Sequence, residues 1–244
     1  MITIDKTTYK ATIFDNRIKF LILHYTEQNF EKSIESLTGS RVSAHYLVND
    51  QNPNHIFQLV EEQNRAWHAG VSNWKGRNNI NDTSIGIEIV NLGFTLDEKN
   101  QKIWHPYPLE QINSVINLCQ QIIHNYDIKP TDIIAHSDIA PSRKVDPGPL
   151  FPWKQLYDNG IGAWYDVGKV KSLMPHIDIL DIKTIQEKFI KYGYGLEATG
   201  IMDSQTHQVI TSFQIHFRPS NFSGILDSET AAILDSLIEK YCEN

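Results

Sequence analysis

The spacing of apolar residues predicts alternating strands and helices up to roughly residue 160. Runs that are almost continuously apolar are typical of strands covered on both faces. The clearest predicted strands are IKFLILHYT (18–26), SAHYLVND (43–50), HIFQLVEE (55–62), TSIGIEIVN (83–91) and TDIIAHS (131–137). Between them, NFEKSIESL (29–37) and LEQINSVINLCQQIIHNY (109–126) have the spacing of helices. The pattern therefore predicts an α/β fold in which helices flank a central β-sheet.

The pattern changes after Trp153, and residues 181–244 have helical spacing without a convincing strand. Helices are predicted near 182–192, 204–217 and 228–242. The last two helices follow related phrases, TGIMDSQTHQVI (199–210) and SGILDSETAAIL (223–234). Each phrase has an Asp-Ser pair that predicts an N-cap, with a threonine three residues after the aspartate. The predicted domains are an α/β domain over 1–162, a linker over 163–180 and a small three-helix domain over 181–244.

Composition and charge exclude several classes of function. The net charge is −7 and the chain has no dense basic run, so we expect no nucleic-acid partner. The apolar runs fall short of the roughly 20 residues that cross a bilayer, so we expect no transmembrane segment. The two cysteines, Cys119 and Cys242, lack the spacing of a metal site and are predicted to be free thiols.

Two histidines and one aspartate form a candidate metal site. By the alternation of its strand, His24 emerges where an apolar run stops, and His136 has the same position at the end of DIIAHS. Asp146 follows in KVDPGP, where the Pro-Gly pair predicts a tight turn. Two imidazoles and a carboxylate are ligands typical of a catalytic zinc site. The residues alone are also compatible with hydrogen-bonded surface histidines, so both interpretations stand at this point.

Two charged residues add chemistry to this candidate site. Glu88 lies on the same face of its apolar strand as Gly86, which leaves open space beside the carboxylate. Glu88 is either a salt-bridged core residue or a general base that deprotonates an attacking water. Lys144 precedes Asp146 by two residues, and it is either a solvated lysine or a cation that stabilises an oxyanion.

Five motifs, in their order along the chain, resemble one known family. They are LILHYT (21–26), SAHYLV (43–48), AWHAG (66–70), NDTSIGIEI (81–89) and AHSDIAPSRKVDPGP (135–149). Together they are similar to the zinc-dependent N-acetylmuramoyl-L-alanine amidases of the amidase-2 class, which are related to animal peptidoglycan recognition proteins. Residues 180–244 resemble the helical peptidoglycan-binding domain that follows the enzyme in the AmiD type of this family.

The resemblance implies a mixed central β-sheet, an activity and a set of site residues. The implied reaction is hydrolysis of the amide bond between the lactyl group of N-acetylmuramic acid and L-alanine of the stem peptide. It implies one Zn²⁺ per chain held by His24, His136 and Asp146, with Glu88 as the catalytic glutamate and Lys144 as the lysine that stabilises the transition state. The implied substrate-binding residues are Tyr25, Trp67, His68 and Arg143. His45 is expected to be structural or to lie behind the site.

The resemblance also implies partners and a location. Peptidoglycan and muropeptides are the implied partners of a monomer in the cell envelope, although a cytoplasmic location stays open because the chain has no evident signal peptide or lipobox. A non-catalytic peptidoglycan-binding protein on the same fold is the alternative function, and a stabilising appendage is the alternative for the last domain. The other histidines have no motif around them, and we assign them no role: His55, His105, His124, His176, His207 and His216.

Overall fold

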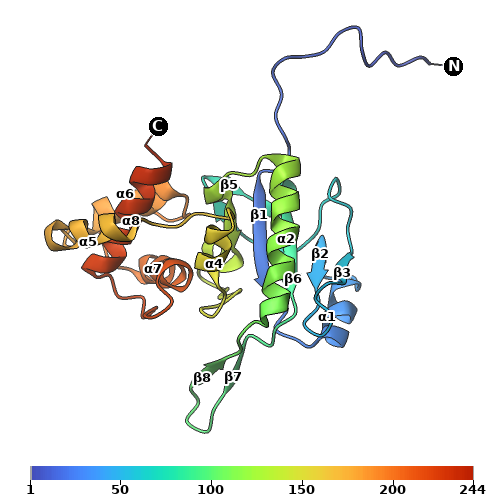
Figure 1. The fold of residues 1–244 in the computed structure, drawn as a ribbon. Helices are drawn as coiled ribbons and strands as arrows, with labels where there is room; N and C mark the ends of the chain where they lie inside the picture. The colour runs from blue at the N-terminus through green and yellow to red at the C-terminus, as the bar shows by residue number, and fades with distance from the viewer. Residues whose placement is uncertain (1, 244) are drawn as a thin grey trace.

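A five-stranded mixed sheet forms the centre of the computed structural model, which describes residues 2–243 (Figure 1). Its order is β3 (Ile56–Gln58), β2 (Tyr46–Val48), β6 (Ser84–Ile89), β1 (Phe20–Tyr25) and β9 (Ile133–Ala135). The pairs β2–β6, β6–β1 and β1–β9 are parallel, whereas the edge strand β3 is antiparallel to β2. The mixed sheet predicted from the sequence is confirmed. All five predicted strands are present, in shorter form.

The register of the sheet decides which side chains share a face. In the parallel pair β1–β6, His24 lies opposite Glu88 and Ile22 lies opposite Gly86. Partners in adjacent strands lie about 4.8 Å apart and point to the same side. The alternation read from the sequence therefore places a histidine and a carboxylate side by side near the carboxyl ends of two central strands. The alternate residues of β6, such as Ile87, are fully buried on the opposite face.

Two helices flank this sheet as the spacing predicts. α1 (Phe30–Leu37) follows β1, and α2 (Leu109–Tyr126) runs along the sheet (Figure 1). Asp127 ends α2 in the left-handed conformation with φ of 54°, and its N–H returns to the carbonyl of Ile123. Helix α2 thus has the predicted bounds, because the helical spacing of its apolar residues ends where Asp127 closes the helix.

Several short elements have no counterpart in the predicted pattern. The hairpin of β7 (Phe94–Leu96) and β8 (Lys102–Trp104) projects from the body of the molecule (Figure 1). The remaining short elements are β4 (Asn73–Trp74), β5 (Arg77–Asn78), α3 (His136–Ile139), α4 (Trp153–Asp158) and the 3₁₀ turns η1 (Ile80–Thr83), η2 (Pro130–Asp132) and η3 (Met174–His176). Within the predicted linker, α5 (Val167–Leu173) is capped by Asp166, whose carboxylate accepts the N–H of Lys169.

The last three helices begin where the sequence predicts. They are α6 (Ile182–Tyr192), α7 (Ser204–Phe217) and α8 (Ser228–Tyr241). Each follows an aspartate whose carboxylate accepts the backbone N–H of a threonine three residues later, at Asp181, Asp203 and Asp227. The capping unit therefore occurs three times, whereas the related phrases indicated two copies.

A buried glutamine accompanies this repeat. Gln186 donates from Nε2 to Thr206 Oγ1, and its Oε1 accepts a glycine N–H in the turn before α7. Gln214 makes the equivalent bonds to Thr230 and to the turn before α8. Both glutamines are fully buried. Helices α6 to α8 are thus linked units in which each glutamine holds the turn and the cap of the next helix.

The hydrophobic core is continuous across the predicted domain boundaries. One cluster of buried side chains extends from Phe20 in β1 to Ile238 in α8, and it includes Trp164 from the predicted linker. The domain boundaries stay a prediction. No helix within residues 2–243 is long and apolar enough to cross a membrane. Both cysteines are free thiols, as predicted.

Candidate metal centre

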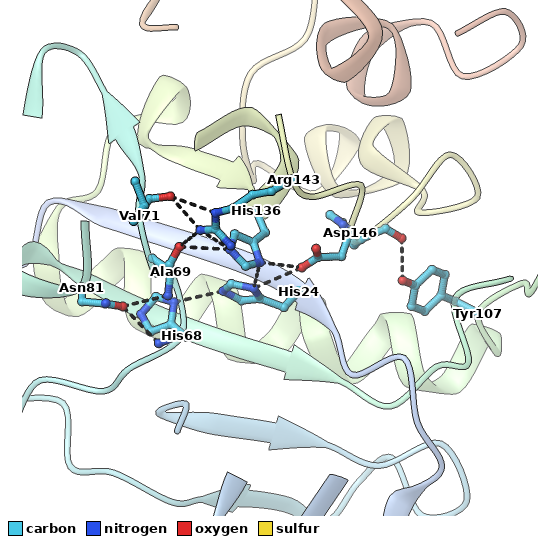
Figure 2. A network of polar contacts seen from close by, with 10 residues as sticks. His24, His68, Ala69, Val71, Asn81, Tyr107, His136, Arg143 and Asp146 are labelled. Atoms are coloured by element: carbon cyan, nitrogen blue, oxygen red, sulfur yellow. Dashed lines mark hydrogen bonds and ion pairs between the residues drawn. The ribbon is translucent and has the colours of Figure 1, made fainter. Parts of the chain in front are cut away.

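Three buried polar side chains meet near the carboxyl ends of the central strands, where α/β sheets commonly bind ligands (Figure 2). His24 Nδ1 lies 2.9 Å from His136 Nδ1 and 3.2 Å from Asp146 Oδ2. His136 Nδ1 lies 2.9 Å from the same carboxylate oxygen. The trio predicted from the sequence is therefore brought together as a group that could hold a metal ion.

The segment that carries His136 differs from the prediction. The sequence predicts His136 at the end of a strand, and this detail is wrong: β9 stops at Ala135, and His136 begins the one-turn helix α3. The turn starts there because Asp138 Oδ2 accepts the N–H of Ala135 at 2.9 Å. The next residue, Ser137, donates its N–H to the carbonyl oxygen of Asp146 at 3.0 Å. Two of the three candidate ligands are thus joined through the backbone of α3.

The hydrogen bonds behind His24 determine which of its nitrogens carries a proton. Ser84 Oγ donates to the carbonyl of Ile80 at 2.7 Å, so it accepts from His68 Nε2–H at 3.2 Å. His68 Nδ1 is then an acceptor, and His24 Nε2–H donates to it at 3.0 Å. This assignment leaves a lone pair on His24 Nδ1, the atom that faces the other two members of the trio.

The second imidazole is oriented by a backbone carbonyl. His136 Nε2–H donates to the Ala69 carbonyl at 3.1 Å, which leaves the lone pair on His136 Nδ1. Two nitrogen lone pairs and a carboxylate oxygen therefore converge within 3.2 Å of one another. Tetrahedral zinc with bonds of about 2.0–2.1 Å separates its ligand atoms by about 3.3 Å. Because like lone pairs repel, the donor set fits a cation placed between them.

Burial and neighbouring charges together set the protonation of His24, His68 and Asp146. Desolvation, followed by the neighbouring charge of His136, lowers the pKa of His24 to about 4. Desolvation and His24 hold the pKa of His68 well below its usual value. Desolvation opposes ionisation of Asp146, but the two imidazoles of the trio outweigh it and lower the pKa of that carboxyl. Near neutral pH His24 and His68 are therefore neutral and Asp146 is a carboxylate.

The carboxylate oxygen Oε2 of Glu88 is neither solvated nor part of a salt bridge within the described residues. Oε2 is buried without a hydrogen-bond partner within the described residues. Burial, with the negative charge of Asp146 as a second cause, raises the pKa of Glu88 well above its usual value. Glu88 also lines a cavity of about 190 Å³ together with Thr26, Gln28 and Val42. A carboxyl group with a raised pKa beside a cavity is suited to take up and release a proton.

The two basic residues of the ligand loop lie in different surroundings. Lys144 is partly buried, and its positive charge acts on Glu88 and His24. Arg143 instead donates to the carbonyls of Ala69 and Val71 and so braces the AWHAG segment from outside (Figure 2). The predicted role of Arg143 in substrate binding stays a prediction.

The remaining predicted substrate residues differ in exposure. Trp67 is 54% exposed, so its ring is accessible. The guanidinium of Arg65 lies over the ring, 4.3 Å from its centroid. Tyr25 is buried beneath the glycines of two loops. His68 is buried, and its ring fills the space that Gly86 leaves open, where a Cβ would lie 2.4 Å from His68 Cγ. The open space predicted beside Glu88 is therefore real, and an imidazole fills it.

Sequence reasoning missed the residues that support the ligands. Asn81 Oδ1 accepts the backbone N–H groups of His68 and Ala69 and so fixes the loop that orients both ligand histidines. Ser84 orients His68 through its hydroxyl. Both residues lie in NDTSIGIEI, one of the five motifs. Small polar residues at the start of an otherwise apolar strand were the available clue.

Comparisons with known proteins find similar sequences and structures. A family model described as N-acetylmuramoyl-L-alanine amidase matches residues 14–149, and one described as a peptidoglycan binding domain matches residues 180–234. The chain is 44% identical over 234 residues to N-acetylmuramoyl-L-alanine amidase AmiD of Escherichia coli K12. That match covers 92% of this chain and 84% of the relative.

Two solved structures are similar over nearly the whole chain. One is E. coli AmiD in complex with the substrate anhydro-N-acetylmuramic acid-L-Ala-D-gamma-Glu-L-Lys, with a TM-score of 0.90, 42% identity, and coverage of 98% of this chain and 95% of that chain. The other is AmpDh3 from Pseudomonas aeruginosa in complex with anhydromuramic pentapeptide, with a TM-score of 0.92, 43% identity and full coverage of both chains.

Proposed function

The chain belongs to the N-acetylmuramoyl-L-alanine amidase family, and from this premise we propose a zinc-dependent peptidoglycan hydrolase in which His24, His136 and Asp146 hold one metal ion. Its reaction is hydrolysis of the amide bond between the lactyl group of N-acetylmuramic acid and the L-alanine of the stem peptide. The observation that carries the ligand assignment is the convergence of two unprotonated Nδ1 atoms and one carboxylate oxygen.

The roles of Glu88 and Lys144 follow from what surrounds them. Zinc, when bound, supplies a Lewis acid for the amide carbonyl and lowers the pKa of water. Glu88 accepts the proton of the attacking water on its unpartnered carboxylate oxygen, which its position opposite His24 in the register supports. The Lys144 ammonium lies close enough to act on Glu88, and there it stabilises the oxyanion of the tetrahedral intermediate.

The substrate class comes from the two relatives whose structures contain muropeptides. We propose that this chain binds peptidoglycan and muropeptides, with anhydromuramyl peptides among its substrates. Trp67 is an exposed aromatic, and its accessibility supports a proposed contact with the substrate. Tyr25, His68 and Arg143 are further proposed contacts. The match of 180–234 to a peptidoglycan binding domain supports attachment of the C-terminal helices to the wall.

The remaining features of the proposal concern organisation and location. We propose a catalytic domain over 1–162, a linker over 163–180 and a peptidoglycan-binding domain over 181–244. We also propose that the chain is a monomer, and that it acts in the cell envelope, a location that its family membership supports. Size measurement in solution and fractionation of the source cells test these two statements directly.

Mass spectrometry of muropeptides tests the function. Purified peptidoglycan and purified anhydromuropeptides are incubated with the full chain, with and without a chelator. We expect release of peptides that begin with L-alanine, loss of this release in chelator, and recovery on addition of Zn²⁺. Cleavage at another bond, or full activity in chelator, would contradict the proposal. Binding to the wall without any cleavage would instead favour a non-catalytic peptidoglycan-binding protein.

A further inference from the structure

The one-turn helix α3 lies between the metal centre and the C-terminal helices. It contains His136, and Ser137 N–H links it to Asp146. An isolated turn of four residues gains too few internal hydrogen bonds to hold its own shape. The orientation of His136 therefore depends on what packs around α3.

The buried carboxylate of Asp138 is the main fixed point of this helix. Asp138 is 1% exposed, and its Oδ2 accepts the N–H of Ala135 within the catalytic domain. The same oxygen accepts His216 Nδ1–H at 2.6 Å, and Oδ1 accepts the hydroxyl of Tyr194 at 2.6 Å. Two of these three donors come from the C-terminal region. Hydrogen bonds to a buried charged group are about twice as strong as neutral ones, so they fix α3 firmly.

A third bond crosses the same boundary. Ser212 Oγ in α7 donates to the carbonyl of Ser137 at 2.9 Å. Ser137 is thus held on both sides, because its N–H is bonded to Asp146 and its carbonyl to α7. The residue that α7 holds, Ser137, directly follows the candidate ligand His136 in the sequence.

Buried aromatic side chains pack around these hydrogen bonds, between the N-terminal part of the chain and the C-terminal helices. Trp74 is fully buried and packs edge-on against Tyr192 and Tyr194, and the ring of His216 stacks on Trp153 at 3.8 Å. Side chains interlocked at this density restrict rigid movement of the C-terminal helices against α3.

We infer that Tyr194, Ser212 and His216 are positioning residues of the metal centre, which they serve by holding α3 and with it His136. The C-terminal helices then have a second task besides wall attachment: they complete the support of a metal ligand in another domain. This inference rests on the proposed function, because it takes His136 as a ligand.

Matched hydroxyl deletions in the full chain test the inference. Tyr194→Phe removes a bond to Asp138, and Tyr192→Phe is its control in the same aromatic cluster. Ser212→Ala removes the bond to α3, and Ser236→Ala is its control, because the buried Ser236 hydroxyl accepts the N–H of Asp166 instead. The zinc dissociation constant is measured by competition with a chromophoric chelator. The visible spectrum of the Co²⁺-loaded protein then reports ligand geometry.

We expect the zinc dissociation constant to rise about tenfold in Tyr194→Phe and somewhat less in Ser212→Ala, with a changed Co²⁺ spectrum. The kcat should fall while KM stays within about twofold, because the proposed substrate contacts are not altered. The controls Tyr192→Phe and Ser236→Ala should keep wild-type zinc affinity even if they lose thermal stability. Unchanged zinc affinity in both test variants, or an equal loss in both controls, would overturn the inference. Failure of the wild-type chain to bind zinc would instead overturn the proposed function.

Discussion

The metal centre and the helical repeat both bury polar side chains, but they satisfy them in different ways. In the repeat, the side-chain amides of Gln186 and Gln214 each donate to a threonine hydroxyl and accept a glycine N–H. In the metal centre, His24, His136 and Asp146 turn acceptor atoms toward one another. Complete pairing stabilises a fold, whereas converging acceptors form a group that could hold a cation. The contrast separates structural polar groups from functional ones within one continuous core.

Among the predictions that test this contrast, we expect the largest loss of activity in Glu88→Gln. Removing a general base costs about 10²- to 10⁴-fold in rate, so kcat should fall by that factor. Zinc affinity should stay near the wild-type value, because Glu88 is not one of the three converging residues. Turnover on a defined muropeptide and zinc content by mass spectrometry check both parts.

Asp146→Ala is the matched variant for this measurement. It removes one of the converging ligands, so zinc content and activity should be lost together. Near-normal turnover in Glu88→Gln would exclude the role of this residue as the base. Retention of zinc in Asp146→Ala would show that the ligand set is wrong.

His68→Phe should have the next largest effect. The substitution keeps a ring over Gly86 but removes the acceptor for His24 Nε2–H, so the favoured tautomer of His24 is lost. Removal of such an outer partner typically weakens metal binding by about 10- to 100-fold. A zinc titration measures the change.

His45→Phe is the control for His68→Phe. His45 is also buried, but its Nδ1 accepts the N–H of Gly86 and not a ligand imidazole. It should lose stability with little change in zinc affinity. An effect of His68→Phe on KM alone would assign this residue to substrate binding instead.

Gln214→Ala should have the smallest effect on function. It leaves a buried glycine N–H, a threonine hydroxyl and a carbonyl without their partner, which costs about 1–3 kcal/mol in the free energy of unfolding. Gln208→Ala on the same helix should cost less than about 0.5 kcal/mol, since that side chain lies near the surface. Chemical denaturation measures both. A loss of zinc affinity in Gln214→Ala without unfolding would mean that this glutamine supports the metal in addition to Ser212 and His216.

Much of the fold and the trio of candidate ligands were predictable because their signals are local. Strand alternation placed His24 and Glu88 on faces that the register confirms, and the helical spacing of apolar residues gave the bounds of α2. The Asp-Ser phrases likewise predicted the caps of α7 and α8. Each of these features is encoded within a few adjacent residues.

The support of the site was not predictable, because it depends on pairs far apart in the chain. His216 was given no role, yet it bonds to Asp138, which lies 78 residues away. A contact between two such distant residues leaves no periodic pattern at either one. The hairpin β7–β8 was missed because its three-residue strands lie outside the longer apolar runs that contain β2, β3 and β9.

The parallel pairing of β1 with β9 has a consequence for synthesis of the protein. The two candidate ligand histidines lie 112 residues apart, so a growing chain exposes His24 long before His136 emerges from the ribosome. Pairing over such a sequence distance is slow, because the intervening loop must close first. Contacts of α3 with Tyr194, Ser212 and His216 are formed later still. We therefore expect the ability to capture zinc to arise at the last stage of folding, when nearly the whole polypeptide has been made.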